Sequence, residues 1–82
     1  MKYKPPKSVN VSLYAAQGRW RWRVETLNGR VIGAATENYH NENDARENLE
    51  LLTGLVVPPE LYGKRHQRFQ YRLSDRWRAG PQ

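Results

Sequence analysis

Arginine alternates with tryptophan over residues 19–24, which read Arg-Trp-Arg-Trp-Arg-Val. Successive side chains of an extended strand point to opposite faces, so Arg19, Arg21 and Arg23 are expected to share one face. Arginines at alternate strand positions stand roughly 6.6–7 Å apart, close to the phosphate spacing along one DNA strand. Arginine also contacts phosphate or guanine through two N–H groups at once. The pattern is typical of a phosphate-binding surface, and equally of the solvated outer face of a sheet.

Further basic residues lie beyond a turn and near the C-terminus. Arg30 can join the first three arginines across a hairpin, and the segment from Lys64 onward is strongly basic. We predict that nucleic acid or an acidic partner is bound by Arg19, Arg21, Arg23, Arg30, Lys64, Arg65, Arg68, Arg72, Arg76 and Arg78.

The three tryptophans allow two interpretations. Trp20 and Trp22 alternate with the arginines, and they are expected to pack on a following helix through Ala45, Leu49 and Leu52. The alternative is a stacking or dimer contact made by Trp20, Trp22 and Trp77.

Charge is unevenly distributed along the chain, whose formal net charge is +6. Residues 1–36 contain seven basic residues and one acidic residue, and residues 61–82 contain six and one. Residues 37–60 contain six acidic residues, with Arg46 as their one basic residue. An acidic block between two basic blocks predicts a folded domain with one acidic and one basic side.

The residue patterns of common catalytic sites are missing. The chain has no cysteine, and His40 and His66 are isolated, with no second ligand at metal spacing. Its serines have no nucleophile-elbow context, and its glycines fall in turns and strands rather than in a phosphate-binding loop. We therefore expect a binding module that is not an enzyme and uses no metal and no cofactor.

The strands that position the arginines are predicted by the same alternation. Residues 8–15 and 19–27 alternate apolar and polar side chains, which indicates two half-buried strands joined by a turn at Gln17-Gly18. Asn28-Gly29 is the strongest short hairpin signal and predicts a type I′ turn, in which both residues have positive φ. Residues 30–37 are expected to return as a third strand, with Gly33 at a bulge or close contact.

A helix is predicted to follow from residues 41–44. Asn41 or Asn43 can cap it, Gly54 can end it, and Pro58-Pro59 prevents its continuation. Glu42 and Arg46 have the spacing of a helical ion pair. The predicted apolar stripe consists of Ala45, Leu49 and Leu52, widened by Leu51 and Leu55.

The last third of the chain fits two structures. Residues 67–74 alternate as a strand does, whereas Phe69, Leu73 and Trp77 recur with helical spacing. Residues 68–73 read Arg-Phe-Gln-Tyr-Arg-Leu and align with residues 19–24, which favours a strand and indicates the start of a second, truncated copy of the unit. The expected fold is α+β, a three-stranded antiparallel meander packed on one helix with room for a fourth, C-terminal strand. Its parts are a flexible segment 1–7, a β-β-β-α unit 8–57 and a basic extension 58–82.

Several of these features occur together in a known family. The chain resembles the YegP-like family, a domain of unknown function, over residues 18–55, through Gly18, the 19–24 run, Asn28-Gly29, Val31-Ile32 and Tyr39 before a helix. The resemblance implies a three-stranded antiparallel sheet on one helix, and members often carry two tandem units or pair as homodimers. It implies no known activity. The sequence departs from the family in the inserted stretch 37–40 and in its basic C-terminal segment.

Two classes of function follow from these patterns. The strand-strand-strand-helix order is similar to the arm-binding domain of phage integrases and to the plant ethylene-response-factor type domain, which lay such a sheet in the major groove. We therefore predict nucleic-acid binding, with DNA as the ligand, through the arginine face. The alternative is a homodimeric protein-interaction module, such as a phage-type inhibitor that binds an acidic surface of a host or defence complex. A homodimer with no ligand is a third interpretation.

Size and hydropathy bear on the location of the protein and on its stability. The N-terminal stretch has no apolar core of a signal peptide, and no run approaches the roughly 18 apolar residues of a membrane helix. We expect an intracellular, cytoplasmic protein with no membrane partner. A chain of 82 residues buries only about 60–65% of its unfolded surface, and dimerisation commonly stabilises such chains.

Overall fold

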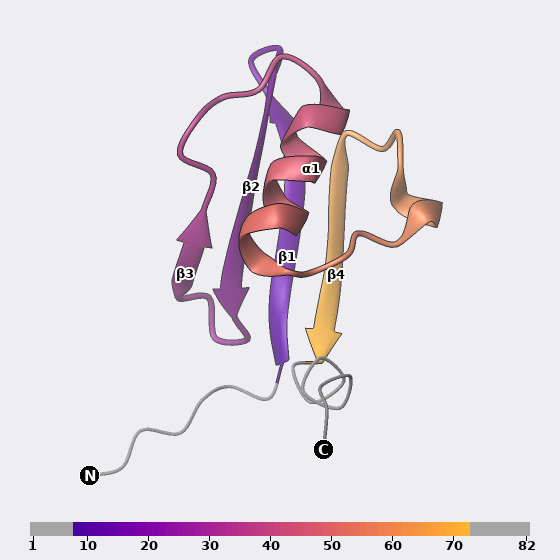
Figure 1. Ribbon diagram of the computed structural model, residues 1–82. Coiled ribbons are helices and arrows are strands. Elements are labelled where there is room, and N and C mark those ends of the chain that lie inside the picture. Colours follow the sequence, from indigo (N-terminus) through magenta and orange to yellow (C-terminus); the bar gives the residue numbers. More distant parts are fainter. Residues whose placement is uncertain (1–7, 73–82) are drawn as a thin grey trace, which may run out of the picture.

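The computed structural model describes residues 8–72 as a four-stranded antiparallel sheet with one helix across one face (Figure 1). The strands are β1 (Ser8–Ala16), β2 (Arg19–Thr26), β3 (Val31–Ala34) and β4 (His66–Arg72). The helix α1 spans Glu42–Thr53, and a short 3-10 turn, η1, spans Pro59–Leu61. The strand order is β3-β2-β1-β4, so β1 and β2 lie in the centre of the sheet. The predicted α+β fold with a fourth C-terminal strand is therefore confirmed.

The core lies between α1 and the sheet face that carries the apolar members of each alternation. Val9, Val11 and Leu13 of β1 are each at most 1% exposed, and they pair in register with residues of β2 and β4. Phe69 and Tyr71 pack against the same cluster from β4. Ala45 and Leu49 close it from the helix, both fully buried. The apolar face of the alternating strands thus packs on the apolar stripe of the helix, as the sequence pattern predicts.

The turn predicted at Gln17-Gly18 is confirmed, whereas the turn at Asn28-Gly29 differs in type from the prediction. Gln17 and Gly18 both have positive φ, 53° and 74°, and Ala16 pairs with Arg19, which is the two-residue type I′ geometry. Between β2 and β3, Gly29 has a φ of 95° and Asn28 does not have a positive φ. The Thr26 N–H donates to the Arg30 carbonyl at 2.8 Å, so that loop has three residues and ends in a left-handed glycine. The predicted type I′ turn at Asn28-Gly29 is wrong.

The third strand is shorter than the predicted residues 30–37. The register between β2 and β3 shifts beside Val24, which confirms the predicted irregularity around Gly33. The Ala35 N–H still donates to the Trp22 carbonyl at 2.9 Å, after which the chain leaves β2. It rejoins β2 at Tyr39, whose N–H and carbonyl both form hydrogen bonds with Trp20. Residues 36–38 therefore form a loop beside β2 instead of continuing β3.

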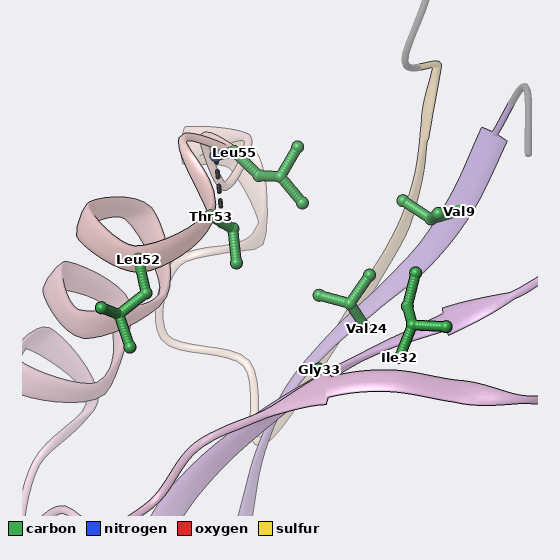
Figure 2. A pocket seen from close by; sticks show the side chains of 7 residues that line it. All are labelled: Val9, Val24, Ile32, Gly33, Leu52, Thr53 and Leu55. Carbon is green, nitrogen blue, oxygen red and sulfur yellow. Dashed lines mark hydrogen bonds between the residues drawn. The ribbon is translucent and has the colours of Figure 1, made fainter. Parts of the chain in front are cut away.

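Both predicted ends of the helix are confirmed. The Asn41 side chain accepts a hydrogen bond from the Asp44 N–H at 2.8 Å, and Gly54 has a φ of 76° and donates to the Glu50 carbonyl. The predicted apolar stripe is only partly right. Leu52 is 60% exposed and Leu51 is 83% exposed. Leu52 borders an open hollow that is also lined by Ile32 and Gly33 of β3 (Figure 2).

Glu42 at the start of α1 anchors the segment that leads into β4. Its Oε2 atom accepts hydrogen bonds from the Gly63 N–H at 2.7 Å and from the Gln67 side-chain amide, and it lies 2.8 Å from the Arg46 guanidinium. The Arg46 guanidinium also lies 3.6 Å from the centre of the Tyr62 ring. The predicted Glu42–Arg46 ion pair is confirmed, and it belongs to a clamp that joins α1 to the start of β4.

Some predictions fall on residues that the structure does not describe. The predicted strand 67–74 is observed as β4 up to Arg72, and its last residues lie outside the described range. Arg76, Trp77 and Arg78, like the predicted flexible segment 1–7, also lie outside it. Within residues 8–72, no helix has the length and apolar character needed to cross a membrane.

Candidate functional site

The sheet face turned away from α1, here called the open face, collects the polar members of three strands. By register, Ser12 of β1 lies between Arg23 of β2 and Arg68 of β4. Tyr14 likewise lies between Arg21 and His66. The open face consists of Asn10, Ser12, Tyr14, Arg19, Arg21, Arg23, Glu25, His66, Arg68, Gln70 and Arg72. It joins two arginine-bearing strands that the sequence separates by about 40 residues into one surface.

The three β2 arginines are held in place by neighbouring groups. Arg19 hydrogen-bonds the His40 ring. Arg21 donates to the Ala35 carbonyl at 3.0 Å and to the Asn38 side-chain oxygen at 2.5 Å. These contacts tie two guanidinium groups to residues 35–40, which follow β3. A guanidinium has five N–H donors, so each arginine keeps donors for a ligand.

Arg23 is the third member of this row and has an acidic neighbour. Its Nε atom lies 2.8 Å from a Glu25 carboxylate oxygen, and its guanidinium carbon lies 5.3 Å from the centre of the Tyr14 ring. The Arg23 side chain is 43% exposed, so water and ligands reach it. Glu25 is the one acidic residue on the open face of the described strands, and it offsets part of the positive charge.

The described basic residues of the C-terminal third divide between β4, which carries Arg68 and Arg72, and the loop before it. Arg68 projects from β4, is exposed, and has no ion-pair partner within residues 8–72. Lys64 and Arg65 are exposed in the loop before β4, and the Arg65 carbonyl accepts a hydrogen bond from the Ala15 N–H at 2.9 Å. Arg72 is exposed at the end of β4, opposite Ser8.

Ser12 is a feature of this face that the sequence analysis did not single out. It is 1% exposed, although it belongs to the face without a helix. Its hydroxyl has no hydrogen-bond partner in the part of the chain that the structure describes. A buried hydroxyl without a partner costs about 1–3 kcal/mol. A small polar residue in a central strand between two arginine strands is the signal that could have pointed to it.

Four acidic residues lie on the other side of the sheet. Glu42, Asp44, Glu47 and Glu50 all belong to α1, which covers the core face (Figure 1). The domain therefore has an acidic helical side and a basic sheet side, as the charge blocks predict.

Three residues that were predicted to contact a ligand do not belong to the open face. Trp22 is 3% exposed, and its indole N–H donates to the Asn48 side-chain oxygen at 2.7 Å, so it cannot stack on a base. Trp20 is half-buried against the core. Arg30 lies in the β2–β3 turn beside Thr26. Thr26 is on the same face of β2 as the buried Trp22, so Arg30 does not extend the arginine row.

The histidines and carboxylates form no compact chemical site within residues 8–72. No three His, Asp or Glu side chains there are grouped closely enough to hold a metal ion. His40 contacts Arg19, and the His66 ring packs on Tyr14 with centroids 6.1 Å apart. The largest chemical contrast in the described structure is therefore electrostatic, between the open face and α1.

Comparison of the chain with protein-family models, with curated proteins and with solved structures finds no match.

Proposed function

We propose that the protein binds nucleic acid, with the phosphate backbone lying on the open face. The observation that carries the proposal is the row Arg23–Ser12–Arg68 across three adjacent strands, in which two arginines from separate strands flank a small central residue. Arginine side chains are among the groups that most often contact phosphate oxygens. Because the row runs across strands that are separate in the sequence, it needs the folded sheet.

The dimensions of the row fit one phosphate group. Neighbouring strands lie about 4.8 Å apart, so the backbones under Arg23 and Arg68 are separated by roughly 9.6 Å. Two arginine side chains can span that gap and converge on an anion between them. The Ser12 hydroxyl lies beneath that point and lacks a partner within residues 8–72.

Arg19 and Arg21 extend the surface along β2 at the usual two-residue spacing, roughly 6.6–7 Å. That spacing lets successive phosphates of one strand meet successive arginines. The contacts of Arg21 with Ala35 and Asn38 reduce the conformational entropy that this side chain loses on binding. The acidic α1 lies on the far side, so repulsion orients the open face toward the ligand.

The test compares variants that change one charge each. Binding of a random-sequence duplex is measured by fluorescence anisotropy for the parent, Arg68→Ala and Lys64→Ala. Arg68→Ala should weaken binding by about tenfold and lower the salt slope by about 1, because one phosphate contact is lost. Lys64→Ala is the control, since this exposed cation belongs to the loop before β4 and not to the sheet.

A gain in affinity supplies the complementary test. Glu25→Gln removes the acidic group of the open face and releases the Arg23 guanidinium from its ion pair. We expect binding to tighten by roughly three- to tenfold. Equal effects of Arg68→Ala and Lys64→Ala, with no gain from Glu25→Gln, would contradict the proposed site. Absence of any binding at low salt would direct attention to an acidic protein surface as the ligand.

A further inference from the structure

The open face carries two aromatic rings, which the proposed phosphate contacts do not use. Tyr14 lies in the central strand β1, and His66 lies directly opposite it at the start of β4. Their ring centroids are 6.1 Å apart with an interplanar angle of 61°, an edge-to-face contact. Tyr14 is half-buried and His66 is exposed. The other residues of the open face have no ring, so its two rings meet at one place.

Guanidinium groups surround this pair of rings. By register, Tyr14 lies between Arg21 of β2 and His66 of β4. The Arg23 guanidinium carbon, from the next row of the sheet, is 5.3 Å from the centre of the Tyr14 ring. That row also contains Arg68, and it lies two residues further along the strands, roughly 6.6–7 Å away. The rings and the phosphate-binding arginines are therefore close enough to contact the base and the phosphate of one nucleotide.

The described part of the chain leaves this face of the sheet accessible to a ligand. The helix α1 packs on the opposite face (Figure 1). Stacking of a base on an aromatic side chain contributes about 1–3 kcal/mol and tolerates any base, because every base has a flat π surface. Sheets that bind single-stranded RNA likewise present rings among basic side chains on an uncovered face. The Tyr14–His66 pair has the same setting, in the middle of a cationic sheet surface.

We propose that the ligand of the open face is a single-stranded nucleic acid, with a base stacked on the Tyr14–His66 pair and its phosphates on the arginines. This inference rests on the proposed function and specifies its substrate. In a duplex the bases are paired and stacked on one another, so the rings would meet only sugar and phosphate. In a single strand the bases can turn toward the rings while the backbone follows the arginines. The rings therefore distinguish a single strand from a duplex, which phosphate contacts alone do not.

The test separates base stacking from phosphate binding by means of a ligand without bases. Fluorescence anisotropy measures binding of a labelled oligothymidylate of about 12 nucleotides and of an abasic oligomer with the same number of phosphates. The parent should bind the oligothymidylate about tenfold more tightly, because the abasic oligomer has nothing to stack on the rings. Deoxyribose and ribose forms of an oligouridylate, compared in the same assay, show whether the preferred strand is DNA or RNA.

Substitutions of tyrosine assign the stacking to the open face. Tyr14→Leu should weaken oligothymidylate binding about tenfold and leave the salt slope and the abasic affinity unchanged, because no phosphate contact is removed. Tyr14→Phe keeps the ring and should keep the parent's affinity. Tyr62→Leu is the matched control, since Tyr62 is 43% exposed but its ring packs on Arg46 of α1. It should not change oligothymidylate binding. Thermal unfolding checks that each variant retains the fold.

The outcomes distinguish this inference from the proposed function. If Arg68→Ala weakens duplex binding but the parent binds the oligothymidylate and the abasic oligomer equally, the open face binds phosphates and the stacking inference is overturned. It is also overturned if Tyr14→Leu, in its folded form, binds the oligothymidylate as tightly as the parent does. A parent that binds neither the single strands nor the duplex at low salt would overturn the proposed function, and the inference with it.

Discussion

Replacing Glu42 with glutamine should destabilise the fold in a way that depends on pH. The Glu42 carboxylate accepts hydrogen bonds from Gly63 and Gln67 and pairs with Arg46, so it ties α1 to the start of β4. Burial acts to raise the pKa of Glu42, but the Gly63 N–H, the Gln67 amide and Arg46 together outweigh it and lower the pKa below its ordinary value of 4.5. The folded state therefore favours the charged carboxylate more strongly than the unfolded chain does.

This shift of the Glu42 pKa determines the direction of the pH dependence. Between the folded and unfolded pKa values the unfolded chain binds more protons, so stability rises with pH there. The contribution of Glu42 is complete above the unfolded pKa near 4.5 and is lost as the pH falls through the folded pKa.

The size of the effect follows from the hydrogen bonds of the carboxylate. Hydrogen bonds to a charged group contribute about 1.5–3 kcal/mol, compared with about 0.5–1.5 kcal/mol for neutral ones. Glutamine keeps an acceptor oxygen and loses the charge. Since all the donors share one oxygen and the Glu42 side chain is 21% exposed, the full differences do not add. We expect Glu42→Gln to lower the free energy of unfolding by about 1–2 kcal/mol near pH 7, a drop in Tm of roughly 5–15 °C.

Thermal unfolding followed by circular dichroism near pH 7 and near pH 3 measures this effect. The difference in Tm between the parent and Glu42→Gln should be large near pH 7 and should shrink as the pH falls below 4.5, because the unfolded chain then takes up the proton at this carboxyl before the folded chain does. Glu47→Gln is the control, because Glu47 is exposed on the same helix and has no ion-pair partner within residues 8–72. An equal difference at both pH values would refute the role of the Glu42 charge.

Two further substitutions test the turns and the core. Gln17→Asn should raise the free energy of unfolding by about 0.5 kcal/mol, because Gln17 has a φ of 53° and asparagine tolerates that conformation better; chemical denaturation measures the gain, and a loss of stability would contradict the type I′ assignment. Trp22→Phe should lower the free energy of unfolding by about 1–3 kcal/mol, because it removes the bond to Asn48 and part of a buried ring. Its nucleic-acid affinity should not change, and a selective loss of affinity in a fully stable variant would restore a stacking role.

The sequence pattern predicted the strands and the helix well because each has a strong period. The helix ends were predictable from Asn41 and Gly54, whose capping roles are local. The type of the β2–β3 turn was not predictable, because Asn28-Gly29 has the ideal composition for a type I′ turn and yet lies in a three-residue loop. The irregular pairing of β3 with β2 accompanies that loop; Gly33 indicates the irregularity but does not give the loop length.

The sequence predicted which residues of one strand share a face, but not which strands lie next to one another in the sheet. Alternation placed Arg19, Arg21 and Arg23 together, and the similarity of residues 19–24 and 68–73 favoured a strand where β4 is observed. The row through Ser12 depends on β4 pairing with β1, which no local pattern specifies. Leu52 was misassigned to the core because it has the spacing of the apolar stripe, whereas its exposure depends on how α1 lies over β3, which no local pattern specifies.

The most direct test of the central proposal is the salt dependence of duplex binding by the parent and by the triple variant Arg21→Ala/Arg23→Ala/Arg68→Ala. If the open face binds phosphates, the logarithm of the parent's binding constant should fall linearly with the logarithm of salt concentration, with a slope of about −3 to −5. The triple variant should bind more weakly, with a slope smaller by about 3. A parent that does not bind at low salt, or a triple variant with the parent's affinity and slope, would contradict nucleic-acid binding by this face.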